Sequence, residues 1–149
     1  MDHPIQAFII CGAPGSGKTT WAKKQGLPII NIDVERKRIL GTWAINPTSE
    51  LKAKAFDAAL IRARAYVNAG QSFIWDATNL KPDRAAVIRH LRSHCRLVGV
   101  VMTTPLALCL KRNRGRSGEI DESIIRNRFA GLQNEPLTRE EGFDEVIYI

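Results

Sequence analysis

The sequence predicts an α/β domain, in which a parallel sheet of about five strands is flanked by helices. Short apolar runs alternate along the chain with longer segments of helical periodicity, which is the order expected when crossover helices join parallel strands. A glycine-rich segment, residues 12–17, separates the first apolar run from the first helical segment. With 149 residues, 44% of them hydrophobic, the chain is expected to form one domain, residues 1–149, around its own core.

Five segments are predicted to be strands because each is short and mostly apolar. They are residues 8–11, 29–32, 72–75, 97–102 and 145–149. The carboxyl ends of parallel strands meet at one edge of a sheet, and open α/β sheets bind their ligands at that edge. Asp33 follows the second strand and Asp76 follows the third, so both carboxylates are expected there.

Most of the chain between these strands is predicted to be helical from its periodicity and from the residues at its ends. The helices are residues 18–25, 34–40, 50–68, 82–93, 106–112 and 121–132. Asp33 can cap the helix that follows it, and Thr104 before Pro105 is typical of a cap followed by proline at the first helical position. A loop at residues 41–48, which contains Pro47, is predicted before the longest helix.

The charge and the cysteines narrow the class of protein. A formal net charge of +7 favours anionic partners, and nucleic acid, a nucleotide or an acidic metabolite would each satisfy it. No apolar run is long enough to span a bilayer, and residues 1–6 lack the features of a signal peptide, so a soluble cytoplasmic protein is expected. Cys11, Cys95 and Cys109 form no CxxC pair and are predicted to be reduced core residues.

The glycine-rich segment matches the phosphate-binding pattern G-x-x-x-x-G-K-[ST] at residues 12–19, between a predicted strand and a predicted helix. Its backbone N–H groups can converge on phosphate oxygens, Lys18 can reach the β- and γ-phosphates, and the Thr19 hydroxyl can bind Mg²⁺. The sequence therefore predicts a P-loop that binds ATP and Mg²⁺. The residues expected to surround the nucleotide are Gly12, Ala13, Pro14, Gly15, Ser16, Gly17, Lys18, Thr19 and Thr20.

The acceptor of the phosphoryl group must be inferred from other residues, because hydrolases and kinases share this loop. Asp33 can accept the proton of an acceptor hydroxyl, or it can serve only as the helix cap. Arg36, one helical turn later, can hold an acceptor phosphate, or it can be a solvated member of the charge run 35–38. Asp76 can pair with Arg36 or assist the metal, or it can cap the following turn.

A basic segment follows the fifth predicted helix. Residues 111–118 carry four positive charges, no negative charge and two glycines, so a mobile surface segment is expected. Arginines on such a segment can close over the γ-phosphate as a lid, here placed at about residues 111–120, with Arg112 and Arg116 as the candidates. The alternative is an exposed basic loop that only contributes solubility.

Several motifs, in this order along the chain, resemble the kinase domain of polynucleotide 5′-hydroxyl kinases. They are GAPGSGKTTW at residues 12–21, NIDVER at 31–36, WDATNLKPD at 75–83, KRNRGRSG at 111–118 and EPLTREEGFDEVIYI at 135–149. The resemblance implies a P-loop kinase fold with an arginine-rich lid. It also implies that Lys18 and Thr19 serve ATP and Mg²⁺ and that Arg112 lies near the nucleotide.

For the acceptor, the resemblance implies that Asp33 is the general base, that Arg36 binds the neighbouring phosphate, that Asp76 is the acidic residue of the acceptor site and that Arg116 is the lid arginine. Two departures qualify it. Ile32 stands where members of the family often carry arginine, so the acceptor pocket is expected to be less cationic or shaped for another molecule. No D-x-D-x-T sequence is present, so 3′-phosphatase activity is not expected.

The sequence therefore predicts an ATP-dependent kinase whose partner is a nucleic acid with a free hydroxyl, most simply the 5′ end of DNA or RNA. Two alternatives stay open within enzymes: a kinase of a small molecule such as a sugar, nucleoside or antibiotic, and a kinase of a hydroxyl on a modified base. A third alternative is a nucleotide-binding module without catalysis, in which Asp33 only caps a helix.

Overall fold

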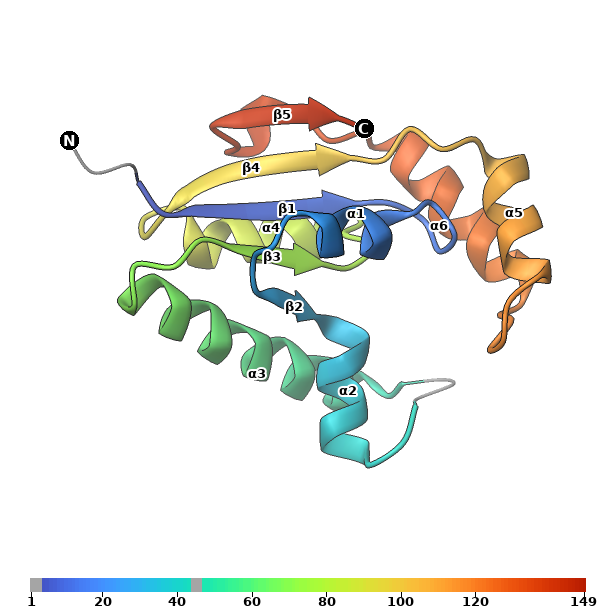
Figure 1. The fold of residues 1–149 in the computed structure, drawn as a ribbon, viewed down its shortest axis with the longest axis horizontal. Helices are drawn as coiled ribbons and strands as arrows, with labels where there is room; N and C mark the ends of the chain where they lie inside the picture. The colour runs from blue at the N-terminus through green and yellow to red at the C-terminus, as the bar shows by residue number, and fades with distance from the viewer. Residues whose placement is uncertain (1–3, 44–46) are drawn as a thin grey trace.

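The computed structural model describes residues 4–43 and 47–149, so part of the predicted loop at 41–48 lies outside the described residues. It shows a five-stranded parallel sheet with strand order β2-β3-β1-β4-β5 (Figure 1). The strands are β1 (Gln6–Cys11), β2 (Ile29–Asn31), β3 (Phe73–Asp76), β4 (Arg96–Val101) and β5 (Glu145–Tyr148). The predicted parallel sheet is confirmed, with strand ends that differ from the predicted ones by one or two residues.

Six helices flank the sheet. They are α1 (Lys18–Lys24), α2 (Ile32–Leu40), α3 (Ser49–Asn68), α4 (Lys81–Leu91), α5 (Leu106–Arg114) and α6 (Glu122–Asn134), and a short 3-10 helix, η1 (Arg139–Glu141), precedes β5. In Figure 1, α1 lies in front of the sheet and α4 behind it, while α5 and α6 stand together beyond the carboxyl ends of the strands. The predicted α/β order is thus confirmed.

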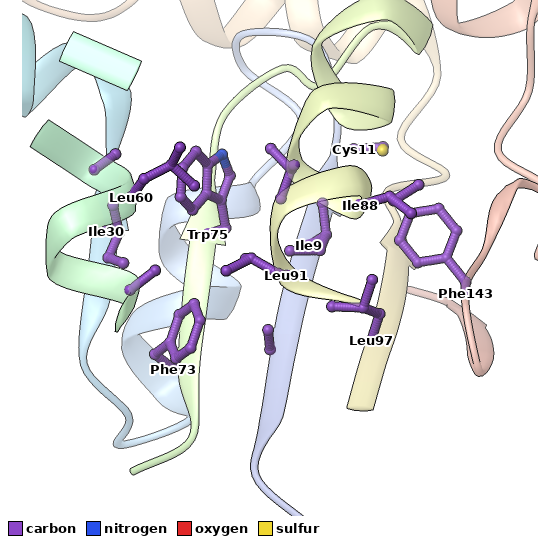
Figure 2. Close-up of a cluster of buried hydrophobic side chains, with 14 of the residues drawn as sticks. Ile9, Cys11, Ile30, Leu60, Phe73, Trp75, Ile88, Leu91, Leu97 and Phe143 are labelled. Carbon is purple, nitrogen blue, oxygen red and sulfur yellow. The ribbon is translucent and has the colours of Figure 1, made fainter. Parts of the chain in front are cut away.

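Alternation of side chains along the strands builds a core on each face of the sheet. Ile9 of β1 packs on the face covered by α3 and α4, with Trp75 and Leu91 in the same cluster (Figure 2). Ile10, the next residue, packs on the opposite face with Ala22 of α1. Because β1 pairs with both β3 and β4, it lies at the centre of the sheet, and the loop that follows it is held at the carboxyl edge.

Two predicted helix caps are wrong. The N-cap of α2 is Asn31, whose Oδ1 accepts the Val34 N–H at 3.1 Å, so the interpretation of Asp33 as the cap is not correct. Strand β2 ends at Asn31, which pairs with Asp76 of β3. Asn31 is therefore the residue directly before α2, which is the N-cap position. Thr104 does not cap α5 either, because Pro105 holds the cap position and the Thr104 hydroxyl donates to the Ser16 carbonyl at 2.7 Å.

The cysteines are free thiols in the part of the chain that the structure describes, as expected. Cys11 and Cys109 are buried and Cys95 is half-buried. Burial raises the pKa of Cys11 to about 12 and that of Cys95 to about 11, so both stay protonated at neutral pH. Across the described residues, no helix combines the length and the apolar character that a membrane span requires.

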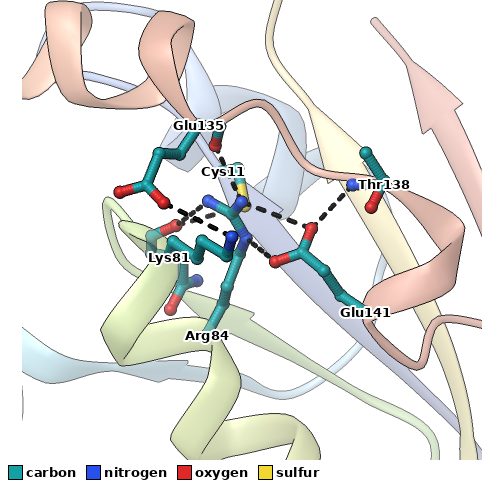
Figure 3. Close-up of polar contacts among 7 residues, drawn as sticks. Cys11, Lys81, Arg84, Glu135, Thr138 and Glu141 are labelled. Atoms are coloured by element: carbon teal, nitrogen blue, oxygen red, sulfur yellow. Dashed lines mark hydrogen bonds and ion pairs between the residues drawn. The ribbon is translucent and has the colours of Figure 1, made fainter.

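A buried arginine joins three segments behind the sheet edge (Figure 3). Arg84 of α4 is 0% exposed, and its Nε lies 2.8 Å from Glu141 Oε1 in η1. The same guanidinium donates to the carbonyl of Glu135 at 2.7 Å and to that of Asn79 at 3.3 Å. Asn79 in turn donates its amide to the Ile10 carbonyl at 2.6 Å, so the network reaches the end of β1.

Candidate functional site

The loop between β1 and α1 has the backbone conformation that a phosphate cradle requires. Gly15 and Gly17 have φ angles of +83° and +90°, in the left-handed region that favours glycine. Close packing adds a second reason at Gly15, where a Cβ atom would lie 2.6 Å from the carbonyl oxygen of Cys109 in α5. Gly17 is the N-cap of α1 and supplies no side-chain acceptor, which leaves the first-turn N–H groups available to an anion.

The loop is braced from outside by residues far away in the sequence. The Gly12 N–H donates to the Thr78 carbonyl at 3.3 Å, and the Thr104 hydroxyl reaches the Ser16 carbonyl. Arg112 Nη1 donates to the Gly15 carbonyl at 3.1 Å. Arg112 thus contacts the P-loop directly, and its predicted place near the nucleotide stays a prediction.

Two carboxylates and two arginines surround the P-loop lysine. Burial lowers the pKa of Lys18, the nearby carboxylates of Asp76 and Asp33 act in the opposite direction, and Arg128 and Arg116 lower this pKa further. Burial disfavours the charged form of the lysine ammonium. A bound polyphosphate would stabilise that charged form, because its negative charge compensates for the lost hydration. The charges of both predicted carboxylates therefore act on the P-loop lysine.

Asp76 lies at the end of β3 beside Thr19. The carboxylate is 1% exposed, and its Oδ2 accepts the Thr19 hydroxyl at 3.0 Å and the Asn31 amide at 3.1 Å. The predicted pairing with Arg36 is not observed, and the hydrogen bonds of Asp76 run to Thr19 and Asn31 rather than to the following turn. Both differences follow from the strand register, which holds Asp76 opposite Asn31.

Two buried side-chain oxygens without a partner mark the site. Within residues 4–43 and 47–149, the only buried side-chain nitrogen or oxygen atoms that lack a hydrogen bond are Ser16 Oγ and Asp76 Oδ1. Buried polar atoms are normally paired, so unpaired atoms at one locus indicate where a polar ligand belongs. One lies in the P-loop and the other belongs to the carboxylate bonded to Thr19.

The oxygen atoms of Thr19 and Asp76 fit a magnesium ion. Mg²⁺ prefers oxygen ligands, keeps several waters and is usually held by one or two protein side chains together with substrate phosphates. A cluster of three or more His, Cys, Asp or Glu side chains, which would suit other metals, does not occur among the described residues. Thr19 and Asp76 thus offer two side-chain oxygen donors, and phosphates would complete the coordination shell of the ion.

Asp33 and Arg36 form an ion pair on the first turn of α2. The Asp33 side chain is 66% exposed, whereas that of Arg36 is 17% exposed, so Arg36 is not the solvated arginine that the charge run allowed. Glu35 is buried. Its Oε1 forms ion pairs with Arg38 Nη1 at 2.8 Å and with Arg62 Nε of α3 at 2.5 Å. These contacts fix α2 against α3 and hold Asp33 and Arg36 at the carboxyl edge.

The first half of the basic segment is helical rather than a loop. Helix α5 continues to Arg114, because Asn113 is buried and exchanges two hydrogen bonds with Ile120, at 3.0 and 2.8 Å. Only residues 115–121 lie between α5 and α6, and the exposed Arg116 is in this short connection. The segment predicted to be the lid, at about residues 111–120, thus consists of the end of α5 and most of the connection to α6, and its action as a lid stays a prediction.

Arg128 of α6 was missed by the reading of the sequence. Arg128 is half-buried and has no carboxylate partner among the described residues. Its positive charge lowers the pKa of Lys18 more than that of Arg116 does. No local motif surrounds it. Its spacing of three residues from Ile125, a core residue of α6, could have placed it on the inward face of the helix.

The fold and the loop define the class of protein: a P-loop kinase fold, which implies binding of a nucleotide such as ATP. Residues 8–133 match the AAA domain family AAA_33, and the chain belongs to that family. No curated protein matches the sequence.

Solved structures share this fold at low sequence identity. A chain of the Pnkp1/Rnl/Hen1 RNA repair complex is 21% identical with a TM-score of 0.79, over 97% of this chain and 48% of that chain. A gluconokinase from Sinorhizobium meliloti is 16% identical with a TM-score of 0.61, over 97% of this chain and 81% of that one. Shikimate kinase from Acinetobacter baumannii is 18% identical with a TM-score of 0.59, over 96% and 82%. The chain thus spans about half of the repair-complex chain, and these likenesses establish the fold.

Proposed function

We propose that the protein is a kinase that transfers the γ-phosphoryl group of ATP to a hydroxyl of a nucleic acid, most simply the 5′-hydroxyl end of a DNA or RNA strand. The hydroxyl oxygen forms a bond to the γ-phosphorus, the bond from that phosphorus to the β,γ-bridging oxygen breaks, and ADP leaves. Asp33 accepts the hydroxyl proton. Lys18 and the loop amides hold the phosphates in line.

One observation carries the proposal: Asp33 and Arg36 form an ion pair on the first turn of α2, and the negative charge of Asp33 is near enough to Lys18 to act on the pKa of that lysine. Asn31 is the N-cap of α2, so the Asp33 carboxylate does not cap this helix. A carboxylate has two oxygens and a guanidinium has five N–H donors, so the pair can bind a hydroxyl and a phosphate without separating. A phosphorylated alcohol such as a 5′-terminal nucleotide offers both groups.

Nucleic acid is supported as the acceptor by three further features. The net charge of +7 favours a polyanion. The motifs around Asp33, Asp76 and the basic segment resemble those of polynucleotide 5′-hydroxyl kinases. A structural neighbour belongs to a complex described as an RNA repair complex.

The remaining residues complete the proposed machinery. Thr19, supported by Asp76, would hold Mg²⁺, whose positive charge would offset negative charge on the transferred phosphate. Arg116 of the lid and Arg128 of α6 offset the negative charge that develops during transfer, while Arg112 positions the loop around ATP. We place all of this in residues 1–149 as one working domain.

The test is phosphorylation of 5′-hydroxyl oligonucleotides by labelled ATP. We expect label to enter DNA or RNA with the native protein and the rate to fall by about 10²- to 10⁴-fold in Asp33→Asn, with ATP binding retained. The matched control is Asp57→Asn, which changes an exposed aspartate of α3. If neither kind of oligonucleotide is labelled by protein that binds ATP, the acceptor is not a nucleic-acid end.

A small-molecule kinase is the second candidate, and Ile32 favours it. This apolar side chain stands beside Asp33, where members of the resembling family often carry arginine, and the gluconokinase and shikimate kinase neighbours have the same fold. Release of ADP in the presence of sugars, nucleosides or other alcohols would identify such an acceptor. Activity on these compounds without activity on oligonucleotides would replace the first proposal with this one.

A further inference from the structure

An exposed aromatic and aliphatic patch lies at the far end of α2 from Asp33. Ile39, Leu40 and Trp43 are 44%, 52% and 56% exposed, which is unusual for large apolar side chains so close together in the sequence. The ammonium of Lys37 lies 4.4 Å from the centroid of the Trp43 ring. None of these residues has a role in the machinery proposed above. We call Lys37, Ile39, Leu40 and Trp43 the α2 platform.

We propose that the α2 platform binds the acceptor strand downstream of its reacting end, with a nucleobase stacked on Trp43. The inference rests on the proposed function and names its substrate class: a single-stranded 5′ end several nucleotides long. An indole ring beside a lysine is the combination that single-strand binding proteins use, since every base has a π-face and every nucleotide brings a phosphate. Trp43 is 56% exposed with the Lys37 ammonium over one face of its ring, so a base would stack on the other face.

The spacing along α2 fits a strand that starts at Asp33. From Asp33 to Leu40 the helix rises about 10 Å, at about 1.5 Å per residue. A stacked strand advances about 3.4 Å per nucleotide, so the platform lies about three nucleotides from the reacting hydroxyl. Arg36, between the two, is on the path of the intervening phosphates.

The charge of the platform favours a nucleic acid over an apolar protein partner. Lys37 has no carboxylate within salt-bridge distance in the described part of the chain, so its charge is available to a phosphate. Arg38 is instead committed to Glu35, which holds the helix in place. Because Glu35 also binds Arg62 of α3, the helix that carries Asp33, Lys37, Ile39 and Leu40 is held against α3.

The kinetic test compares acceptors of different length. For the native protein, KM should be lower for a 5′-hydroxyl single strand of about eight nucleotides than for a dinucleotide. Trp43→Ala should raise KM for the longer strand about tenfold and leave the dinucleotide unaffected, and Trp43→Phe should restore most of the loss because a ring remains. Tyr148→Ala is the control, since Tyr148 is 66% exposed on β5 at the opposite edge of the sheet from α2.

A binding measurement separates this inference from the proposed function. Fluorescence anisotropy of a 3′-labelled single strand reports affinity without turnover, so it applies even if no oligonucleotide is phosphorylated. Weaker binding by Trp43→Ala, with native binding by Tyr148→Ala, supports the platform. Equal affinities and equal length dependence in Trp43→Ala and the native protein overturn it, and the patch would then belong to a different kind of partner.

Discussion

Replacement of Arg84 by methionine is the sharpest test of how the fold holds its phosphate loop. Methionine keeps much of the apolar stem but removes the charge and every N–H donor. Glu141, whose side chain is 15% exposed, would lose its buried partner. The carbonyls of Glu135 and Asn79 would lose a donor as well.

The magnitude follows from these contacts. Breaking a buried ion pair by removing one partner costs about 3–5 kcal/mol, a large part of the 5–15 kcal/mol that stabilises a typical domain. For a chain of this size, about 2–4 °C is lost per kcal/mol, so Tm should fall by roughly 6–20 °C. Adding Glu141→Leu should recover part of this loss by removing the unpaired carboxylate. Recovery should be incomplete because the two carbonyls stay unsatisfied.

Urea unfolding of the native protein, the two single variants and the double variant would measure this coupling. A second readout is the affinity for ATP, since Asn79 connects Arg84 to the end of β1. If Arg84→Met changes the free energy of unfolding by less than about 0.5 kcal/mol, as a surface substitution would, the network does not stabilise the fold and the reasoning fails.

Three further predictions concern the site. Because burial lowers the pKa of Lys18 below its ordinary 10.5, the unfolded chain binds more protons just below that pH, so the free energy of unfolding should rise with pH there. Lys18→Met should remove that rise in alkaline urea titrations and abolish stabilisation by ATP; an unchanged pH dependence would contradict it. Asp76→Asn should lower kinase activity about 10- to 100-fold and raise the Mg²⁺ concentration required, as measured by ADP release, since Asp76 supports Thr19; unaltered Mg²⁺ dependence would exclude this role. Arg116→Ala should reduce kcat about a thousandfold with little change in KM for ATP, whereas Arg112→Ala should mainly raise that KM because Arg112 holds the Gly15 carbonyl; the reverse pattern would exchange their roles.

The sequence predicted those features that depend on neighbouring residues. The P-loop at residues 12–19 is a local pattern of glycines with one required conformation, and its strand-to-helix setting followed from the apolar runs on either side. The strand and helix order was predictable for the same reason. Asp33 and Asp76 were placed at the carboxyl edge because each follows a strand, and both act on Lys18 in the structure.

Features that depend on distant residues were not predictable. Asn31 and Asp33 are both good caps, and only the pairing of β2 with β3 decides between them. The Thr104 hydroxyl bonds to the Ser16 carbonyl, 88 residues away, instead of capping the adjacent helix. Arg84 and Glu141 are 57 residues apart, and their contact joins α4 to the segment before β5 in one buried network.

The central position of β1 has a consequence for how the protein matures on the ribosome. Its two partners, β3 and β4, are synthesised only when the chain reaches residues 73–76 and 96–101. Strand β1 therefore waits unpaired until these later strands are made, and the bracing of its loop by Arg112 arrives later still. A nascent chain should therefore acquire its affinity for nucleotide abruptly and well after the loop itself has been synthesised.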